Sequence, residues 1–140
     1  MIIVVDVNPL ISALIRDSSA RSIIVSVNFD FCFPEPALQK IRKYKSYIIG
    51  KSGLSELEYL VILNTLLKFI RIIPVEEILH HWDNAKKIME HIDPEDVTFI
   101  AAALSQEEAI IWSDDEHFKK QDKIKVLKTK DMTSLFSSLN

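Results

Sequence analysis

The stretch Met1-Ile-Ile-Val-Val-Asp6-Val-Asn8 decides how the rest of the chain is arranged. Its apolar run is rich in β-branched residues, is too short for a buried helix and is soon followed by Pro9, which predicts a buried strand. The strand ends at Asp6. An ionised carboxylate at the end of a buried strand is costly unless a cation or a hydrogen-bond donor meets it. The function of the chain therefore depends on what lies around Asp6.

The composition predicts one globular domain over residues 1–140. The chain is 48% hydrophobic and 26% charged, which is typical of a folded rather than a disordered protein, and it is long enough for a substantial core. The most apolar region, residues 59–73, is interrupted by charged and amide side chains, so we expect no membrane span. Met1 opens directly into the strand without a basic leader, and Cys32 is the only cysteine. Both features predict a cytoplasmic protein without disulfides.

Hydrophobic periodicity predicts alternating strands and helices. We expect strands over residues 1–5, 29–33, 71–75, 109–113 and 124–127, and helices over 9–15, 20–27, 35–50, 54–70, 76–92, 95–107 and 131–139. Hairpin signals are scarce, so the pattern predicts an α/β fold with a largely parallel sheet and helices on both faces. The helix over 54–70 is apolar nearly all round, and we expect it to be deeply buried or packed against a partner.

Acidic residues follow two strands and begin one helix. Asp6 ends the first strand, Asp114 and Asp115 follow the fourth, and Asp93 and Asp96 flank a helix start. Ligands of parallel α/β sheets bind beyond the carboxyl ends of the strands. Carboxylates that converge there need a compensating charge, and oxygen ligands favour Mg²⁺ or Mn²⁺. Such an ion activates water and aligns a phosphodiester. The chain has only two glycines, so a glycine-rich phosphate loop is excluded.

Most of these acids also have a purely structural explanation. Asp93-Pro94-x-Asp96 matches the first residues of a capped helix, with Asp96 reaching back as in a capping box. Asp114 and Asp115 suit a turn. Asp6 has no such explanation, so the spacing alone leaves both the metal site and the structural interpretation open.

Three segments resemble the PIN-domain family. They are Val5-Asp6-Val-Asn8-x-Leu10-Ile11-x-Ala13-Leu14, Asp93-Pro-Glu-Asp96-Val-Thr-Phe99-Ile-Ala101-Ala102-Ala103-Leu104 and Ile111-Trp112-Ser113-Asp114-Asp115-Glu-His117-Phe118. The resemblance implies a three-layer α/β/α sandwich and a metal-dependent ribonuclease that cleaves single-stranded RNA. The family includes the toxins of VapBC toxin–antitoxin pairs. Carried over by position, Asp6, Asp96 and Asp115 are the catalytic and metal-binding acids, and Asp93 is a further metal ligand. Asn8 and Ser113 are then supporting polar residues that orient the carboxylates.

One position departs from the family pattern. Lys40 stands where the resemblance implies another acid, in the helix after the second strand. A positively charged side chain there would repel a second metal ion and lower the affinity of the site for the first. Three interpretations follow: Glu35 supplies the missing carboxylate, Lys40 contacts the scissile phosphate beside a single metal, or the nuclease is impaired and only binds RNA or a partner.

Basic residues and histidines leave further alternatives open. The net charge is −3, but basic residues cluster within 40–51 and 119–130, which indicates either solvated faces or contacts with an RNA backbone. Among the four histidines no zinc-like spacing occurs. His117 follows the acid pair and either touches substrate or packs.

The sequence therefore predicts a Mg²⁺- or Mn²⁺-dependent RNA endonuclease. Its expected partners are RNA, an antitoxin protein and a second copy of the chain, with helix 54–70 as an interface. Asp6→Asn is expected to abolish cleavage and leave the fold intact. The alternative is a catalytically impaired module that binds RNA or protein through the same fold. A receiver-like regulatory domain would need an aspartate at the end of a mid-chain strand, and the sequence has none suitably placed.

Overall fold

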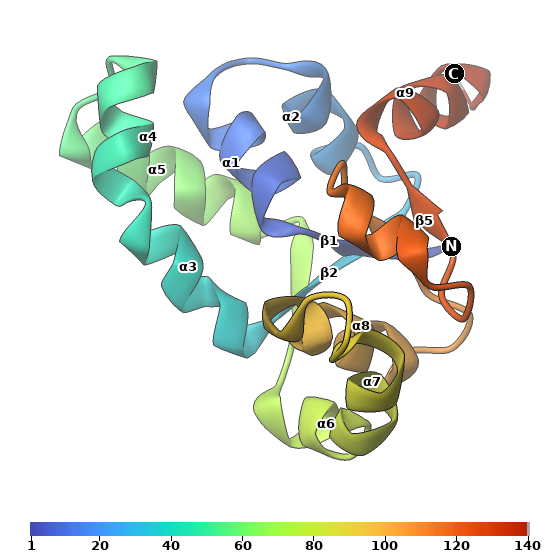
Figure 1. The fold of residues 1–140 in the computed structure, drawn as a ribbon. Helices are drawn as coiled ribbons and strands as arrows, with labels where there is room; N and C mark the ends of the chain where they lie inside the picture. Colours follow the sequence, from blue (N-terminus) through green and yellow to red (C-terminus); the bar gives the residue numbers. More distant parts are fainter. Residues whose placement is uncertain (140) are drawn as a thin grey trace.

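The computed structural model describes residues 1–139, which form one parallel sheet with helices on both faces (Figure 1). The strand order is β3-β2-β1-β4-β5, and every neighbouring pair is parallel. The strands are β1 Ile2–Val5, β2 Asp30–Pro34, β3 Ile70–Ile73, β4 Ile110–Trp112 and β5 Val126–Leu127. The predicted α/β fold with a parallel sheet is therefore confirmed.

Helices cover the sheet in two layers. One layer holds α1 Val7–Ile15, α2 Ser19–Ile24, α3 Leu38–Lys43, α4 Lys45–Ser52, α5 Glu56–Leu67 and α9 Thr129–Ser138. The opposite layer holds α6 Val75–Leu79, α7 Trp82–Met89 and α8 Val97–Leu104. Helix α8 contacts β1, β2 and β4, and its buried Ala101, Ala102 and Ala103 have side chains small enough to permit this close approach. The arrangement is the expected three-layer α/β/α sandwich.

The central strand β1 marks the point where the chain changes direction across the sheet. Ile3, Val4 and Val5 are fully buried, as their apolar run predicts. From β1 the chain builds β2 and β3 on one side, then returns to add β4 and β5 on the other. The carboxyl ends of β1 and β4 therefore flank a topological switch point, where parallel α/β sheets bind their ligands.

Two predicted helices are broken in the structure. The segment 35–50 begins as the 3₁₀ turn η1 Glu35–Ala37 and then divides into α3 and α4 at Tyr44 (φ −92°, ψ 7°). The segment 76–92 divides at His80 and His81 into α6 and α7, both of which contact α8. Neither break lies at a proline or a glycine, so the local sequence does not predict it.

Helix α5 is shorter and more exposed than expected. It begins at a capping box between Ser55 and Glu58 and buries only Tyr59 and Leu66. Leu57 is 72% exposed. Of the two alternatives, deep burial is therefore wrong, and packing against a partner stays a prediction. The helix lies at the periphery of its layer, where α1 and β3 cover only one of its faces.

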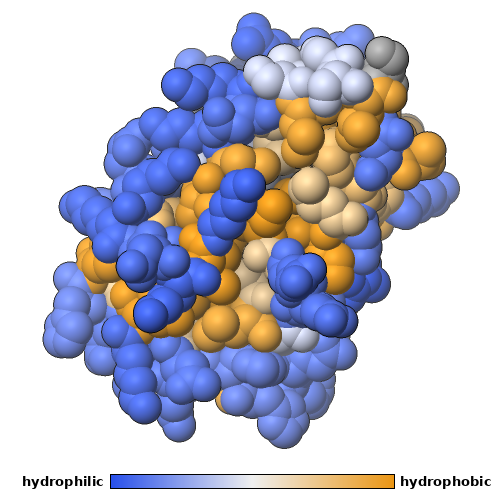
Figure 2. All heavy atoms as spheres, turned by 90° about the vertical axis from the view of Figure 1, so that its right-hand side faces the viewer, coloured by the Kyte–Doolittle hydropathy of each residue, from blue (hydrophilic) through white to orange (hydrophobic). Residues whose placement is uncertain are grey.

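A second partly apolar surface lies at the β5 edge of the sheet. Figure 2 shows apolar side chains gathered among polar ones on the side of the molecule that carries β5 and α9. A shallow cavity of about 380 Å³ there is lined by Met1, Ile110, Leu127 and Leu135, with polar residues at its rim. Exposed apolar surface of this kind is typical of faces that bind other proteins.

No helix within residues 1–139 combines the length and apolar character needed to cross a membrane.

Candidate metal centre

A cavity of about 420 Å³ lies at the carboxyl ends of the strands. Its walls come from Asp6 and the first turn of α1, from the loop after β4, from α3 and its end at Tyr44, and from Asp93 with the 3₁₀ turn η2 Pro94–Asp96 that precedes α8. Acidic and basic side chains face one another across it; the lining residues are Asp6, Val7, Asn8, Lys40, Lys43, Tyr44, Asp93, Glu95, Asp96 and Asp115. The four aspartates proposed from the sequence as metal-site acids therefore converge.

Asp6 is met by two hydrogen-bond donors. Its Oδ1 accepts from the Val7 backbone N–H at 2.8 Å, so that the residue caps α1, and its Oδ2 accepts from the Ser113 hydroxyl at 2.6 Å. Burial raises the pKa of Asp6, against the lowering effect of these two bonds. The charge of Asp115 raises it further, whereas the charge of Lys40 lowers it. Asp6 is thus a buried carboxylate held in place by its neighbours.

Ser113 links the ends of the two central strands. Besides donating to Asp6, its Oγ accepts from the Asp115 backbone N–H at 3.0 Å. Asp115 in turn caps the 3₁₀ turn η3 Glu116–Lys120, accepting from the His117 N–H at 2.9 Å. One buried hydroxyl therefore sets the relative positions of Asp6 and Asp115.

Asp93 and Asp96 differ sharply in environment. Asp93 caps η2 by accepting from the Glu95 N–H at 3.0 Å. Asp96 does not form the predicted capping box: it is only 7% exposed, and its Oδ2 is buried without a hydrogen-bond partner. A polar atom left in this state is expensive, so the structural explanation that suffices for Asp93 fails for Asp96.

The two carboxyl groups also differ in pKa. Burial, together with the nearby charges of Asp93, Asp6 and Asp115, raises the pKa of Asp96 to about 8. For Asp93, burial alone would raise the pKa, but bonds from the Glu95 N–H, Asp96 and His117 outweigh it, and the pKa is lowered. Asp96 is therefore the acid that holds a proton near neutral pH, and a cation can replace that proton.

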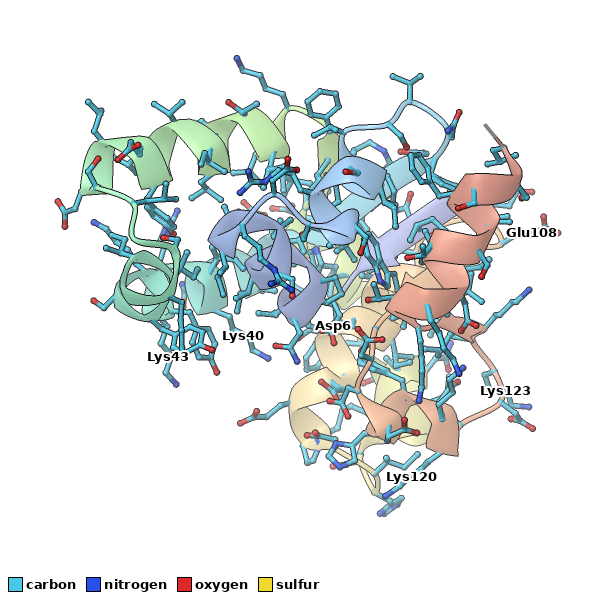
Figure 3. All side chains as sticks on the ribbon, turned by 90° about the horizontal axis from the view of Figure 1, so that it is seen from above. Asp6, Lys40, Lys43, Glu108, Lys120 and Lys123 are labelled. Atoms are coloured by element: carbon cyan, nitrogen blue, oxygen red, sulfur yellow. The ribbon has the colours of Figure 1, made fainter. Side chains whose placement is uncertain are left out.

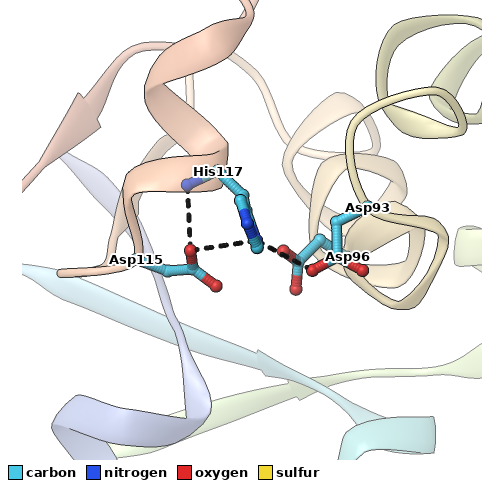
Figure 4. A group of neighbouring side chains, drawn as sticks. All are labelled: Asp93, Asp96, Asp115 and His117. Carbon is cyan, nitrogen blue, oxygen red and sulfur yellow. Dashed lines mark hydrogen bonds and ion pairs between the residues drawn. The ribbon is translucent and has the colours of Figure 1, made fainter.

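His117 is the site residue whose position the sequence did not predict. Its Nδ1 lies 3.0 Å from Asp93 Oδ2 and 3.3 Å from Asp115 Oδ1 (Figure 4). One potential ligand atom from each of Asp93, Asp96, Asp115 and His117 lies within 4.8 Å of all the others. The available signal was the capping acid two residues before the histidine, because the bond from the His117 N–H holds its ring close to that carboxylate.

Asp6, Asp114 and Asn8 lie outside this cluster of four ligand atoms. Asp6 lines the same cavity, but its two oxygens accept from Val7 and Ser113. Asp114 binds Thr129 instead, accepting from its N–H at 2.9 Å and its hydroxyl at 2.6 Å, so its role is to anchor α9. Asn8 is exposed and lines the cavity, but among residues 1–139 its side chain makes no hydrogen bond to the acids. Of the two supporting polar residues, only Ser113 contacts the carboxylates in this structure.

Lys40 faces the acids across the cavity. Lys40 and Lys43 extend from α3 on the side of the molecule where Asp6 lies, as Figure 3 shows from above. The Lys40 ammonium also lies 5.7 Å from the centre of the Phe99 ring. Glu35, the alternative source of a carboxylate, accepts instead from the Val75 N–H at 3.0 Å and does not line the cavity. The structure therefore contradicts the substitution of Glu35 for the missing acid.

The second basic cluster does not reach the cavity. Lys119 donates to the Val126 carbonyl at 2.9 Å, and Lys128 pairs with Glu116. Lys120 and Lys123 lie far from Asp6 in Figure 3. Among the basic residues of the 40–51 cluster, only Lys40 and Lys43 line the cavity.

The donor set fits a divalent cation. Carboxylate oxygens are the ligands of Mg²⁺ and Mn²⁺, and the unpartnered Asp96 oxygen gains a partner when such an ion is bound. Even with Asp96 protonated, the four other carboxyl groups that line the cavity outnumber its two ammonium groups, those of Lys40 and Lys43.

Comparison with known proteins agrees with this architecture. A chain in the crystal structure of VapBC2 from Rickettsia felis matches this chain with a TM-score of 0.70. In that crystal structure VapBC2 is bound to a DNA fragment from the VapBC2 promoter. The match covers 91% of this chain and 98% of the other at 15% identity, so it supports the fold alone. No curated protein matches the sequence significantly. A family model of the PIN domain matches residues 4–135, and the chain therefore belongs to the PIN-domain family.

Proposed function

We propose that this protein is a metal-dependent endonuclease that cleaves single-stranded RNA. Asp6, Asp93, Asp96 and Asp115 hold a divalent ion, Mg²⁺ or Mn²⁺, in the cavity. The observation that carries the proposal is the buried, unpartnered Oδ2 of Asp96, which lies in a cavity lined by three further aspartates. Membership of the PIN-domain family supports nuclease chemistry, and the preference for single-stranded RNA follows from the resemblance of the three motifs.

The residues of the cavity have different roles in the proposed reaction. When bound, the cation supplies charge neutralisation and an activated water. Ser113 keeps Asp6 and Asp115 oriented, and Asp96 releases its proton as the ion binds. Lys40 and Lys43 face the acids and contact the phosphate backbone, because an RNA strand that reaches the acids must pass these two ammonium groups.

The proposal is tested by incubating the purified chain with end-labelled single-stranded RNA and a matched duplex. Cleavage of the single strand is expected with Mg²⁺ or Mn²⁺ and none with EDTA. Asp6→Asn, prepared in parallel, should lower the rate on the order of 100-fold or more, because it removes one charge from the cation site. Asparagine can still accept from the Val7 N–H, so circular dichroism of the variant should match the wild type. Cleavage that survives EDTA, or an undiminished rate in Asp6→Asn, would contradict the proposal.

A second candidate function is a PIN-fold module that binds RNA or protein without cleaving it. The position of Lys40 favours this candidate, because an ammonium group occupies a cavity where the family pattern implies another acid. Metal binding and RNA binding without any cleavage in the assay above would support this candidate over the nuclease.

We further propose that the chain is the cytoplasmic toxin of a toxin–antitoxin pair, with the exposed apolar face of α5 available to an antitoxin or to a second copy. The structural likeness to a chain of a VapBC complex supports this role. Expression of the wild type is expected to arrest growth and Asp6→Asn to be tolerated. If a small antitoxin-like protein is encoded beside this chain, its co-expression should restore growth. Unimpeded growth despite abundant folded wild-type protein would count against the toxin role, and light scattering would report the oligomeric state.

A further inference from the structure

We propose that His117 supplies a nitrogen ligand to the cation through Nδ1, and that this ligand makes the site favour Mn²⁺ over Mg²⁺. The inference rests on the proposed function, since it concerns the same cation. His117 is not among the acids that the motifs identify. A nitrogen ligand also distinguishes Mn²⁺ from Mg²⁺, which a site made only of oxygen ligands would not.

The spacing of the ligand atoms is the first argument. Six-coordinate ions hold their ligands at about 2.1 Å, which places adjacent ligands about 3.0 Å apart and opposite ligands about 4.2 Å apart. His117 Nδ1 is 3.0 Å from Asp93 Oδ2 and 3.3 Å from Asp115 Oδ1, close to the separation of adjacent ligands. The whole group, with Asp96 included, lies within 4.8 Å. The imidazole is therefore already at ligand spacing from the carboxylates (Figure 4).

The unpartnered oxygen of Asp96 is the second, independent argument. A simple ion pair would explain why His117 approaches Asp93 and Asp115. It would leave the most buried acid of the group unsatisfied, because Asp96 Oδ2 has no hydrogen-bond partner and the residue is 7% exposed. A cation shared by the imidazole and the three carboxylates satisfies all four side chains at once.

The backbone of His117 is held in place by Asp115, and its ring is held by contacts with Asp93 and Asp115. The His117 backbone N–H donates to Asp115 Oδ1 at 2.9 Å, which keeps the residue at the start of η3 and its ring beside the acids. A neutral imidazole with its proton on Nε2 presents the Nδ1 lone pair to an ion. His117 therefore needs only to adopt this tautomer in order to bind.

The identity of the ion follows from the nitrogen. Mg²⁺ prefers oxygen ligands and gives up its water reluctantly, whereas imidazole is a good ligand for transition metals. Replacing one oxygen of the ligand set by Nδ1 thus strengthens Mn²⁺ binding relative to Mg²⁺.

Pulsed electron paramagnetic resonance of the full chain with one equivalent of Mn²⁺ tests the proposal. We expect a ¹⁴N modulation in the wild type, and its replacement by the ¹⁵N pattern in protein labelled with ¹⁵N-histidine. His117→Gln should lose the modulation. His91 is exposed and lies outside the acidic cluster, so His91→Gln should keep it. The labelling experiment needs no substitution and reports a histidine ligand even if His117→Gln fails to fold. Among the described residues, His117 is the one histidine in the acidic cluster, so absence of the ¹⁵N pattern would overturn the proposal.

Calorimetric titration gives a second readout. His117→Gln is expected to weaken Mn²⁺ binding about tenfold or more and Mg²⁺ binding much less. Bound Mn²⁺ without nitrogen modulation, or an equal loss for both ions, would overturn the role of His117 and leave the proposed function standing. A wild-type chain that binds neither ion at millimolar concentration would overturn both.

Discussion

Replacing Asp96 with asparagine is expected to abolish cation binding and RNA cleavage while stabilising the metal-free protein at pH 8. The cleavage rate should fall on the order of 100- to 1,000-fold, because the variant loses the buried carboxylate at the centre of the site. A side chain that is kept for function at a cost in stability should show opposite effects on the two when it is replaced, and we expect this of Asp96.

The gain in stability depends on pH in a defined direction. The pKa of Asp96 is raised to about 8 in the folded protein from its ordinary value of 3.8. Below about pH 4 the group is protonated in both states and its contribution to stability is fully present. Between about pH 4 and pH 8 the unfolded chain loses the proton that the folded chain keeps, so the free energy of unfolding of the wild type falls. Asparagine stays neutral throughout and removes this loss.

Thermal unfolding in EDTA measures the effect. Asp96→Asn should melt near the wild type below about pH 4, should exceed it modestly at pH 5 and should exceed it by several degrees more at pH 8, since each kcal/mol moves Tm by about 3 °C in a domain of this size. Adding Mn²⁺ at about 100 times Kd should stabilise the wild type by about 2.7 kcal/mol and leave the variant unchanged.

Asp114→Asn is the matched control for Asp96→Asn. Both oxygens of Asp114 bind Thr129 rather than the cluster, so this variant should lose some stability and keep the full Mn²⁺ response. An Asp96→Asn protein that is stabilised by Mn²⁺ as strongly as the wild type would refute the site.

Replacing Lys40 with glutamate is expected to tighten cation binding about tenfold and to slow RNA cleavage about 100-fold. The substitution turns a positive charge that faces Asp6 and Asp96 into a negative one, which favours the cation. It also removes the ammonium that we place against the scissile phosphate, and the new carboxylate repels the RNA. Calorimetry and single-turnover cleavage measure the two effects separately.

Two companion variants make the result specific to Lys40. Lys43→Glu introduces the same charge change on the same helix and should weaken RNA binding with a smaller effect on the cleavage step. Lys40→Ala separates the loss of the ammonium from the addition of an acid. If cleavage rises in Lys40→Glu, Lys40 is a disabled ligand position, and the wild type is better described as the impaired binding module.

The local sequence around Asp6 specifies the strand that carries it and the edge of the sheet at which it lies. The apolar run of β1 predicts a buried strand because only a strand fits so short a segment, and alternation of strands and helices predicts parallel pairing. The convergence of Asp6 and Asp115 follows, since carboxyl ends of parallel strands meet at one edge. Asp93 and Asp96 join them because the helix that leads into a parallel strand begins at that same edge. The positions of strands and of acids at their ends depend on residues close in sequence, so a local sequence pattern is enough to predict them.

The role of each side chain within the cavity was decided only by the tertiary structure. Asp93 forms its cap while Asp96 is left with an unpartnered oxygen, although the sequence pattern assigns both to one capping box. The adjacent acids Asp114 and Asp115 likewise turn to different partners, Thr129 and His117. The exposed face of α5 and the breaks at Tyr44 and His81 depend on what covers each helix.

The sequence by itself therefore determined the α/β class, the parallel sheet and the end of the sheet at which the acids gather. The tertiary structure alone decided which acid lacks a partner, that His117 joins the cluster, and that Lys40 rather than Glu35 faces it. The physical reason is that periodicity and strand ends depend on residues close in sequence. Burial, pKa and hydrogen bonding depend on segments such as β1, η2 and η3, which are far apart along the chain and meet only in the folded protein.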